Sequence, residues 1–242
     1  SKVKRNRPTV FGKFGKDIAL LVGDALLFKG LMFLSEAVER GVSTKNIQAI
    51  INIVKVMFFE LGDAEALELQ FRGRMDVTPE EYLHVVRKKA ADVEAHTRIG
   101  AILGGGSEEE IEKLGHYGRL LGMMIIMSDD LMDMIDFQET QHRIEKEHLS
   151  FPLIYVLQNP KTKSSLSSVL QKKMITKRDA KRILELTLEI EGFEQLEKLK
   201  QGLTRKGFQL IRNLRKNDNL SNLIKYVCLP FNKWRNSSST TT

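Results

Sequence analysis

Apolar residues recur every three to four positions along nearly the whole chain, which is the period of an α-helix. The strict alternation of apolar and polar residues that is typical of a strand is absent, and only five prolines interrupt the 242 residues. The pattern predicts an all-α protein with one helical domain over residues 1–235. We expect a polar tail at 236–242 to stay disordered, because it has no apolar side chain to bury.

Cap residues mark where the predicted helices begin and end. Thr78 with Glu81, and Ser107 with Glu110, have the spacing of a capping box, and the glycines at 104–106 end the helix between them. Segment 17–40 is apolar around most of its surface, so we expect this helix to be buried. The predicted helices cover 17–40, 43–71, 78–103 and 107 to about 130, with others from Phe151, Lys163 and Thr176 and further helix to about Val227.

The charge of the chain suggests an anionic partner without identifying it. A formal net charge of +7 suits nucleic acid, anionic lipid and phosphorylated metabolites alike. Zinc-finger spacing and an aromatic-rich RNA-binding pattern are absent from the sequence, yet a basic helical nucleic-acid binder stays an alternative. No run approaches the roughly 18 to 20 apolar residues of a membrane span. Cys228 is the single cysteine, so we expect a cytoplasmic protein with at most peripheral membrane contact.

Asp129, Asp130 and Asp133 form the most unusual local feature of the chain. On a helix Asp129 and Asp133 lie one turn apart, with Asp130 beside them, so their charges repel. Near a helix C-terminus each charge also opposes the macrodipole, by about 0.3 to 1 kcal/mol. A bound Mg²⁺ ion would reverse both penalties, because it takes carboxylate oxygens together with substrate phosphates.

A solvated acidic helix end explains the same spacing, so the three carboxylates alone do not decide between the two interpretations. The apolar run 123–127 leads directly into the acids and places them at the wall of an apolar region. A metal-bound diphosphate head beside an apolar pocket is what a prenyl substrate requires. This context favours the metal site.

With these residues, the sequence resembles the polyprenyl synthetase family. Asp129 to Asp133 resembles the family's second Asp-rich motif, preceded as expected by the Tyr-Gly-Arg-Leu-Leu-Gly segment that begins at Tyr117. Four further segments resemble the family in the same order along the chain. They are the basic segment 4–10, the Gly-Asp segment 23–27, the helix 82–90 with Lys89, and the Pro-Leu-Ile-Tyr segment 151–157.

The resemblance implies a bundle of antiparallel helices around a deep cavity. In this family two Asp-rich motifs hold Mg²⁺ on an allylic diphosphate, and isopentenyl diphosphate attacks the carbocation formed on ionisation. By position, Lys4, Arg5 and Lys89 resemble the basic residues that contact the diphosphates, and Lys89 is the predicted catalytic residue. Asp129, Asp130 and Asp133 are the predicted Mg²⁺ ligands, and a homodimer, or a heteromer with another synthase subunit, is expected.

The sequence departs from the family pattern at four places. The first Asp-rich motif does not occur in these residues, Ile125-Ile126 stands where Phe-Gln is usual, and Ala90 replaces a threonine after Lys89. The segment after Asp133 is shortened and lacks its Gly-Lys elements, so that His148 or Lys146 becomes the candidate for the lysine near Pro152. We expect this segment alone to catalyse poorly. A non-catalytic or regulatory subunit of a heteromeric synthase is therefore the main alternative.

The sequence assigns ordinary roles to two acids and two histidines. Glu65 and Glu68 lie where the family often carries acids below the metal site, but solvation on a helix surface is favoured. His84 and His96 have no partner at metal-binding spacing on one helix, so they are interpreted as ordinary helix residues.

Overall fold

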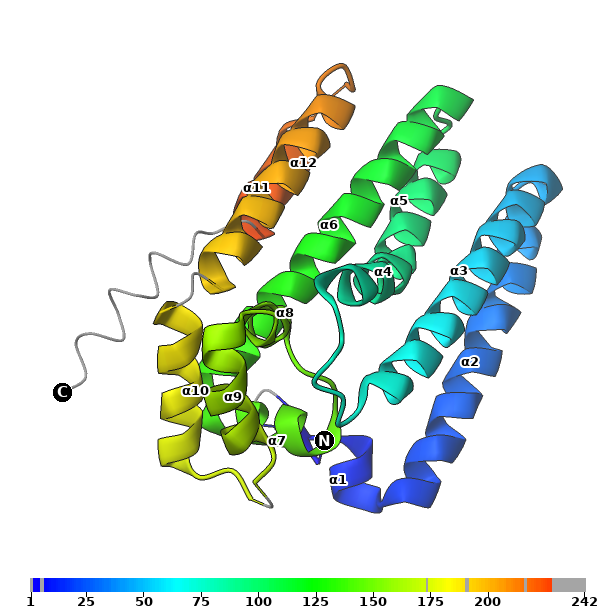
Figure 1. The fold of residues 1–242 in the computed structure, drawn as a ribbon. Helices are drawn as coiled ribbons and strands as arrows, with labels where there is room; N and C mark the ends of the chain where they lie inside the picture. Colours follow the sequence, from blue (N-terminus) through cyan, green and yellow to red (C-terminus); the bar gives the residue numbers. More distant parts are fainter. Residues whose placement is uncertain (1, 5–6, 173, 190–191, 216, 228–242) are drawn as a thin grey trace. The chain divides into compact units, whose positions relative to one another are not determined.

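The computed structural model describes residues 2–4, 7–172, 174–189, 192–215 and 217–227, with the backbone alone at Lys4, Ile135 and Glu189 (Figure 1). The all-α prediction is confirmed. The chain divides into two compact units, residues 1–52 and 53–242, and the boundary falls inside one long helix. The single domain over 1–235 stays a prediction, and the predicted tail 236–242 lies outside the described residues.

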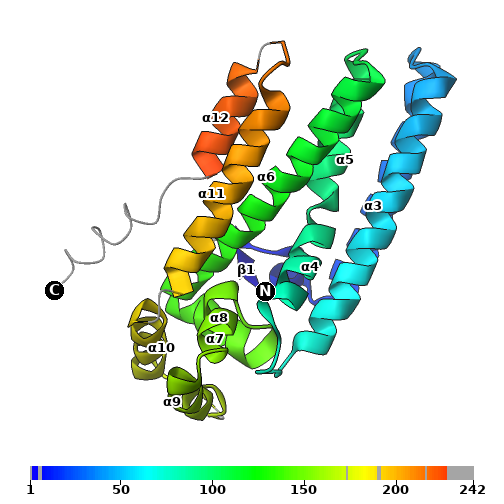
Figure 2. The ribbon, with the colours of Figure 1, turned by 45° about the horizontal axis from the view of Figure 1, so that its top comes forward.

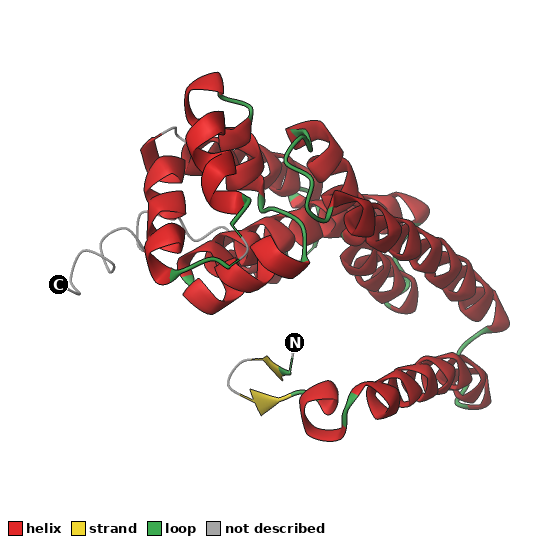
Figure 3. Cartoon of the chain, turned by 60° about the horizontal axis from the view of Figure 1, so that its bottom comes forward, coloured by secondary structure: helices red, strands yellow, loops and turns green. Residues whose placement is uncertain are grey.

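The first unit begins with a short hairpin, which the sequence pattern did not predict. Strands β1 (Val3–Lys4) and β2 (Arg7–Pro8) pair antiparallel, with Val3 opposite Pro8 (Figure 3). Helix α1 (Val10–Phe14) follows, and Thr9 caps it by accepting a hydrogen bond from the Gly12 amide. Helix α2 (Lys16–Glu39) and the start of α3 (Thr44–Phe71) complete the unit, close to the predicted bounds.

The expectation that the first long helix is buried is wrong. The structure buries no residue of α2, although the helix carries large apolar side chains such as Leu26, Phe28 and Met32. By length and composition alone, α2 also meets the requirement for a membrane span, with a mean hydropathy of 1.9 over its most apolar 18 residues. Asp24, Lys29 and other charges interrupt the run, which is why the sequence pattern did not indicate it.

The second unit starts in α3 and continues to the C-terminal end of the described chain. Its helices are α4 (Pro79–Lys89), α5 (Ala91–Leu103), α6 (Glu108–Ile135), α7 (Phe137–Lys146), α8 (Phe151–Leu157), α9 (Pro160–Leu170), α10 (Lys177–Glu189), α11 (Gly192–Ile211) and α12 (Asp218–Val227). The capping boxes of Thr78 with Glu81 and of Ser107 with Glu110 form as predicted.

One predicted helix is two helices in the structure. The segment 78–103 breaks at Ala90, whose φ of −71° and ψ of 2° end α4 before α5 begins. Ala90 is fully buried against Gly122 of α6, where an added Cβ would lie 2.9 Å from the Cβ of Ala90. The break therefore brings the chain close to α6 at the end of α4 that carries Lys89.

Helix α6 runs through the middle of the second unit, with α5 on one side and α11 on the other (Figures 1 and 2). Its buried apolar residues serve two cores. Met123, Met127 and Leu131 pack with residues of α4 and α8, whereas Tyr117 and Met124 pack towards α11 and α12. Met123, Met124 and Met127 are all buried, so these flexible side chains fill space in the two cores.

Candidate functional site

The Asp-rich segment lies in the last turns of α6, where the chain turns into a helix that the sequence pattern did not indicate. Asp136 ends α6 and begins α7, because its carboxylate accepts hydrogen bonds from the amides of Gln138 at 2.8 Å and Glu139 at 3.2 Å. Thr140 fastens the two helices together by donating to the carbonyl of Asp133 at 3.0 Å. Helix α7 is thus held against the carboxylates of α6.

Arg143 of α7 lies between two of the predicted metal ligands. Its Nη2 is 2.7 Å from Asp130 Oδ1 and 2.6 Å from Asp133 Oδ2, and its Nε donates to the same Asp133 oxygen at 2.8 Å. Tyr82 of α4 donates its hydroxyl to the other oxygen of Asp130. Burial makes these bonds strong, since Asp130 is only 2% exposed.

Glu68 of α3 forms a second charged group with Lys89 and His148. Lys89 Nζ donates to both Glu68 oxygens, at 2.9 and 2.8 Å, and His148 Nε2 lies 2.8 Å from Glu68 Oε1. Burial on its own would raise the pKa of Glu68, but the hydrogen bonds from His148 and Lys89 outweigh it and lower this pKa from 4.5 to about 2. Glu68 therefore stays ionised and holds both basic side chains.

Tyr82 joins the two charged groups. The centre of its ring lies 6.2 Å from the His148 ring and 5.5 Å from the Phe151 ring. Burial, together with the adjacent Asp130 charge, raises the pKa of the Tyr82 hydroxyl well above 10, so this hydroxyl stays protonated and donates. We name Glu68, Tyr82, Lys89, Asp130, Asp133, Arg143 and His148 the polar cluster.

The basic groups of the polar cluster are held in their protonated form by the acids beside them. Burial opposes the positive charge of His148, yet the contact with Glu68 raises its pKa above 6.5. Burial likewise opposes the charge of Lys89 and Arg143, and their carboxylate partners raise both pKa values. The cluster thus pairs cations with carboxylates at the edge of an apolar core that includes Val85, Met127 and Phe151.

The structure brings some of the sequence-predicted site residues together. Asp130, Asp133 and Lys89 belong to the polar cluster, whereas Asp129 is exposed at the end of α6. Lys4 lies in β1 of the first unit, with only its backbone described, and Arg5 lies outside the described residues.

Tyr82, Arg143 and the role of Glu68 were missed by sequence reasoning. The expectation that Glu68 is a solvated surface acid is wrong, because its side chain is only 16% exposed and is paired twice. Between the alternatives His148 and Lys146, the structure places His148 in the cluster. The signal for Arg143 was available in the sequence: Asp136 as an N-cap predicts a helix over 137–146.

The carboxylates of Asp130 and Asp133, as placed, do not fit a divalent metal ion. A Mg²⁺ ion needs oxygen atoms free to coordinate it, but Arg143 contacts one oxygen of Asp130 and one of Asp133, and Tyr82 contacts the remaining Asp130 oxygen. Among the residues that the structure describes, no group of three or more His, Cys, Asp or Glu side chains is placed to hold a metal ion.

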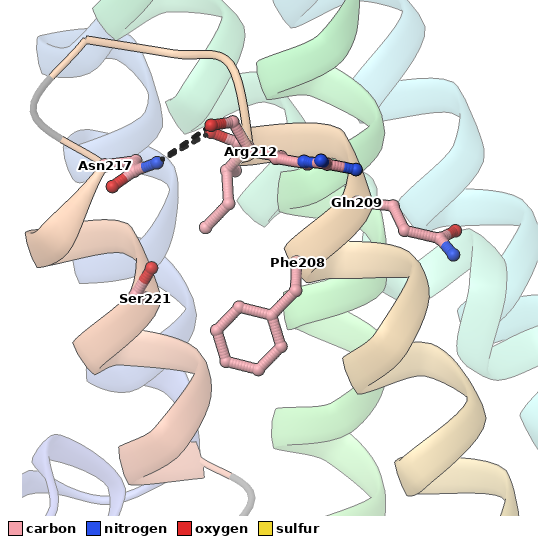
Figure 4. A pocket seen from close by; sticks show the side chains of 6 residues that line it. Phe208, Gln209, Arg212, Asn217 and Ser221 are labelled. Atoms are coloured by element: carbon pink, nitrogen blue, oxygen red, sulfur yellow. Dashed lines mark hydrogen bonds between the residues drawn. The ribbon is translucent and has the colours of Figure 1, made fainter.

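Two cavities lie away from the polar cluster. One, of about 350 Å³, lies between α11 and α12, where Asn217 donates to the carbonyls of Ile211 and Arg212 beside Phe208 (Figure 4). The other, of about 750 Å³, lies along α9 and α10 and is lined by Lys172, Asp179 and neighbouring charged residues. Neither is lined by a residue of the cluster, so the predicted prenyl site does not correspond to them.

The profile of the polyprenyl synthetase family matches residues 1–187. The chain belongs to the polyprenyl synthetase family. The match includes all five segments on which the resemblance rested, and it includes α2.

Relatives in this family carry synthase names. The chain is 35% identical over 140 residues to a short chain isoprenyl diphosphate synthase of Methanothermobacter thermautotrophicus, across 57% of this chain and 42% of that protein. It is 33% identical over 148 residues to a geranylgeranyl diphosphate synthase of Methanosarcina mazei, across 61% of this chain and 45% of that protein. The matched segment therefore spans less than half the length of these curated relatives.

Solved structures of synthases share the fold. The geranylgeranyl pyrophosphate synthetase of Pyrococcus horikoshii superposes with a TM-score of 0.83 at 23% identity, over 95% of this chain and 72% of that one. A polyprenyl synthase of Caulobacter crescentus, complexed with calcium and isoprenyl diphosphate, superposes with a TM-score of 0.82 at 19% identity, over 95% of this chain and 71% of that one. At these identities the likeness shows the fold alone.

Proposed function

We propose that the protein containing this chain is a prenyltransferase, which condenses isopentenyl diphosphate with an allylic diphosphate to make a longer polyprenyl diphosphate. The observation that carries the proposal is the convergence of motif residues from separate elements. Lys89 of α4 and Asp130 and Asp133 of α6 belong to one polar cluster beside an apolar core. Family membership and the relatives' names support the same activity and favour phosphorylated substrates over nucleic acid as the anionic partner.

In this proposal Lys89 binds a substrate diphosphate. Its side chain keeps 28% of its surface exposed, and Glu68 holds it in place from the side of α3. A partly buried, protonated amine stabilises the charge that develops on a departing diphosphate. The apolar core around Val85, Phe151 and Met127 keeps water away from an allylic carbocation, which water would otherwise quench.

Magnesium stays a prediction for the whole protein. When bound to the diphosphates, it would supply positive charge for their departure. In the second Asp-rich motif, Arg143 and Tyr82 contact both oxygens of Asp130 and one oxygen of Asp133, so these three atoms are not open to such an ion.

The contact of Arg143 with the Asp-rich motif also favours a second function, that of a supporting subunit of a heteromeric synthase. A motif neutralised from within its own chain is expected where a partner chain carries the complete site. Assembly with a second chain, in a homodimer or a heteromer, is supported by α2, whose large apolar side chains are mostly exposed among the described residues. We retain the cytoplasm as the proposed location.

The proposed activity is tested by measuring how the full protein containing this chain incorporates labelled isopentenyl diphosphate into lipid, with farnesyl and geranylgeranyl diphosphates as co-substrates. Lys89→Ala is expected to lower kcat/KM about 100-fold or more, because a charge-assisted contact to the diphosphate is lost. Lys88→Ala is the matched control, because Lys88 is the preceding residue of α4 and pairs with Asp63 instead. Its activity is expected to change less than about threefold.

The outcome also separates the two functions. Product formed by the protein alone, and lost in Lys89→Ala but not in Lys88→Ala, supports the prenyltransferase. Product that forms only after a second synthase chain is added makes this protein a supporting subunit. An equal loss of activity in Lys89→Ala and Lys88→Ala would contradict the role of Lys89 in diphosphate binding.

A further inference from the structure

Arg143 occupies the position from which a metal ion would contact the second Asp-rich motif. Its Nη2 bridges Asp130 Oδ1 and Asp133 Oδ2, at 2.7 and 2.6 Å. These two carboxylates lie three residues apart on α6, so one small cation can contact both of them. A guanidinium forms such paired contacts with a fixed, planar set of donors.

Several features hold the guanidinium in place. Asp136 and Thr140 fasten the start of α7 to the end of α6, so the backbone beneath Arg143 is anchored on both sides of the turn. Tyr82 holds Asp130 from the opposite side. The Arg143 side chain itself is only 14% exposed, so a metal ion entering the motif would leave a poorly solvated positive charge without its partners.

Arg143 also has one N–H group that makes no hydrogen bond to the described residues. Its Nη1 is buried and has no hydrogen-bond acceptor among the described residues. A buried donor of this kind is available for an oxygen atom of an anion, such as a phosphate oxygen. A metal ion at a diphosphate site would bind the same kind of oxygen.

We propose that Arg143 is a built-in cation that takes the place of a divalent metal ion at the second Asp-rich motif. With Arg143 present, Asp130 and Asp133 do not bind a divalent ion. The inference rests on the assignment of residues 129–133 to this motif, and it does not require the proposed condensation activity.

The experiment measures Mn²⁺ binding to the full protein by water-proton relaxation, without any prenyl substrate, so an inactive protein is tested as well as an active one. The variants are Asp133→Asn, Arg143→Gln and the two combined. Arg212→Gln is the control. Arg212 directly follows α11, is exposed and lies outside the polar cluster, so this variant also removes one guanidinium but leaves the motif intact. Mn²⁺ bound elsewhere in the protein is common to all variants and cancels in the comparison.

We expect Asp133→Asn to change Mn²⁺ affinity less than about twofold, because the motif holds no ion while Arg143 is present. Arg143→Gln should add a Mn²⁺ site, which the combined variant loses and Arg212→Gln does not show. A tenfold or greater weakening of Mn²⁺ binding in Asp133→Asn overturns the proposal. A folded Arg143→Gln that gains no site overturns it too. Should Arg143→Gln not fold, the comparison of the wild type with Asp133→Asn decides alone.

Discussion

At the scale of single residues, Glu68 shows how burial and pairing change the role of an ordinary acid. It has an exposed neighbour one turn earlier in α3, Glu65, whose side chain is 66% exposed and lies 3.5 Å from Lys89. Glu68 is 16% exposed and binds both Lys89 and His148. Two acids on one helix thus differ in role because only one of them faces the packed interior.

The pairing of Glu68 with His148 predicts a pH dependence of stability. The pKa of Glu68 falls from 4.5 to about 2 on folding. Glu68 therefore stabilises the folded protein above pH 4.5, and this stabilisation is lost as the pH falls towards 2. Folding raises the pKa of His148 above 6.5. His148 therefore stabilises the folded protein below pH 6.5, and this stabilisation is lost as the pH rises through the raised pKa. Between these limits, wild type should exceed Glu68→Gln by about 2 to 3 kcal/mol in free energy of unfolding.

Urea unfolding at about pH 3, 5.5 and 9 measures this difference. Glu65→Gln is the matched control, and the exposure of Glu65 limits its expected effect to about 0.5 kcal/mol. A difference between wild type and Glu68→Gln that stays constant over the three pH values would show that the pair does not form.

At the scale of elements, the contact between α5 and α6 depends on small residues of α6. An added Cβ at Gly118 would lie 2.7 Å from the carbonyl oxygen of Val93, and one at Gly122 would lie 2.9 Å from the Cβ of Ala90. Backbone cannot give way as a flexible side chain does, so these glycines set how closely the two helices approach. The approach matters for the polar cluster because α6 carries Asp130 and Asp133 to it.

Gly118→Ala is therefore expected to lower the free energy of unfolding by about 1 to 3 kcal/mol, because the new methyl group forces α5 and α6 apart. Gly100→Ala, in the last turn of α5, is the control, since a Cβ there meets nothing within 4 Å. It should be neutral or stabilising by up to about 1 kcal/mol, because alanine favours the helix. Thermal unfolding followed by circular dichroism compares the two, and equal melting temperatures would contradict the packing argument.

At the scale of the whole molecule, the two units differ in how they satisfy their apolar residues. The second unit buries the apolar sides of its helices in two cores. The first unit leaves α2 exposed, including Phe28 at 67% and Leu31 at 49%. An uncovered apolar helix of this length is typical of a surface that another chain covers.

Phe28→Asp tests this feature. If the protein assembles through α2, as proposed, light scattering should give a dimer for wild type. The variant should dissociate at least tenfold more readily, because a charge replaces an exposed ring that the contact would bury. Leu103→Asp, at an exposed site at the end of α5 (55% exposed), is the control and should leave the assembly unchanged. A wild type that is monomeric at all concentrations would contradict the assembly.

The sequence by itself determined the fold class, most helix bounds and the family. Capping boxes such as Thr78 with Glu81, glycine stops and a 3.6-residue period act within a few residues of one another, so they can be recognised along the chain. The Asp-rich segment was noticed in the same way, whereas Lys89 was assigned by its position in the resemblance to the family.

Only the tertiary structure decided which side chains meet. Arg143 contacts Asp130 across the turn into α7, Glu68 and His148 are 80 positions apart, and α2 stays uncovered although its pattern predicts burial. Periodicity shows that a face is apolar, but it does not show what will pack against that face. The energy of a buried charge likewise depends on partners that folding brings in from distant parts of the chain.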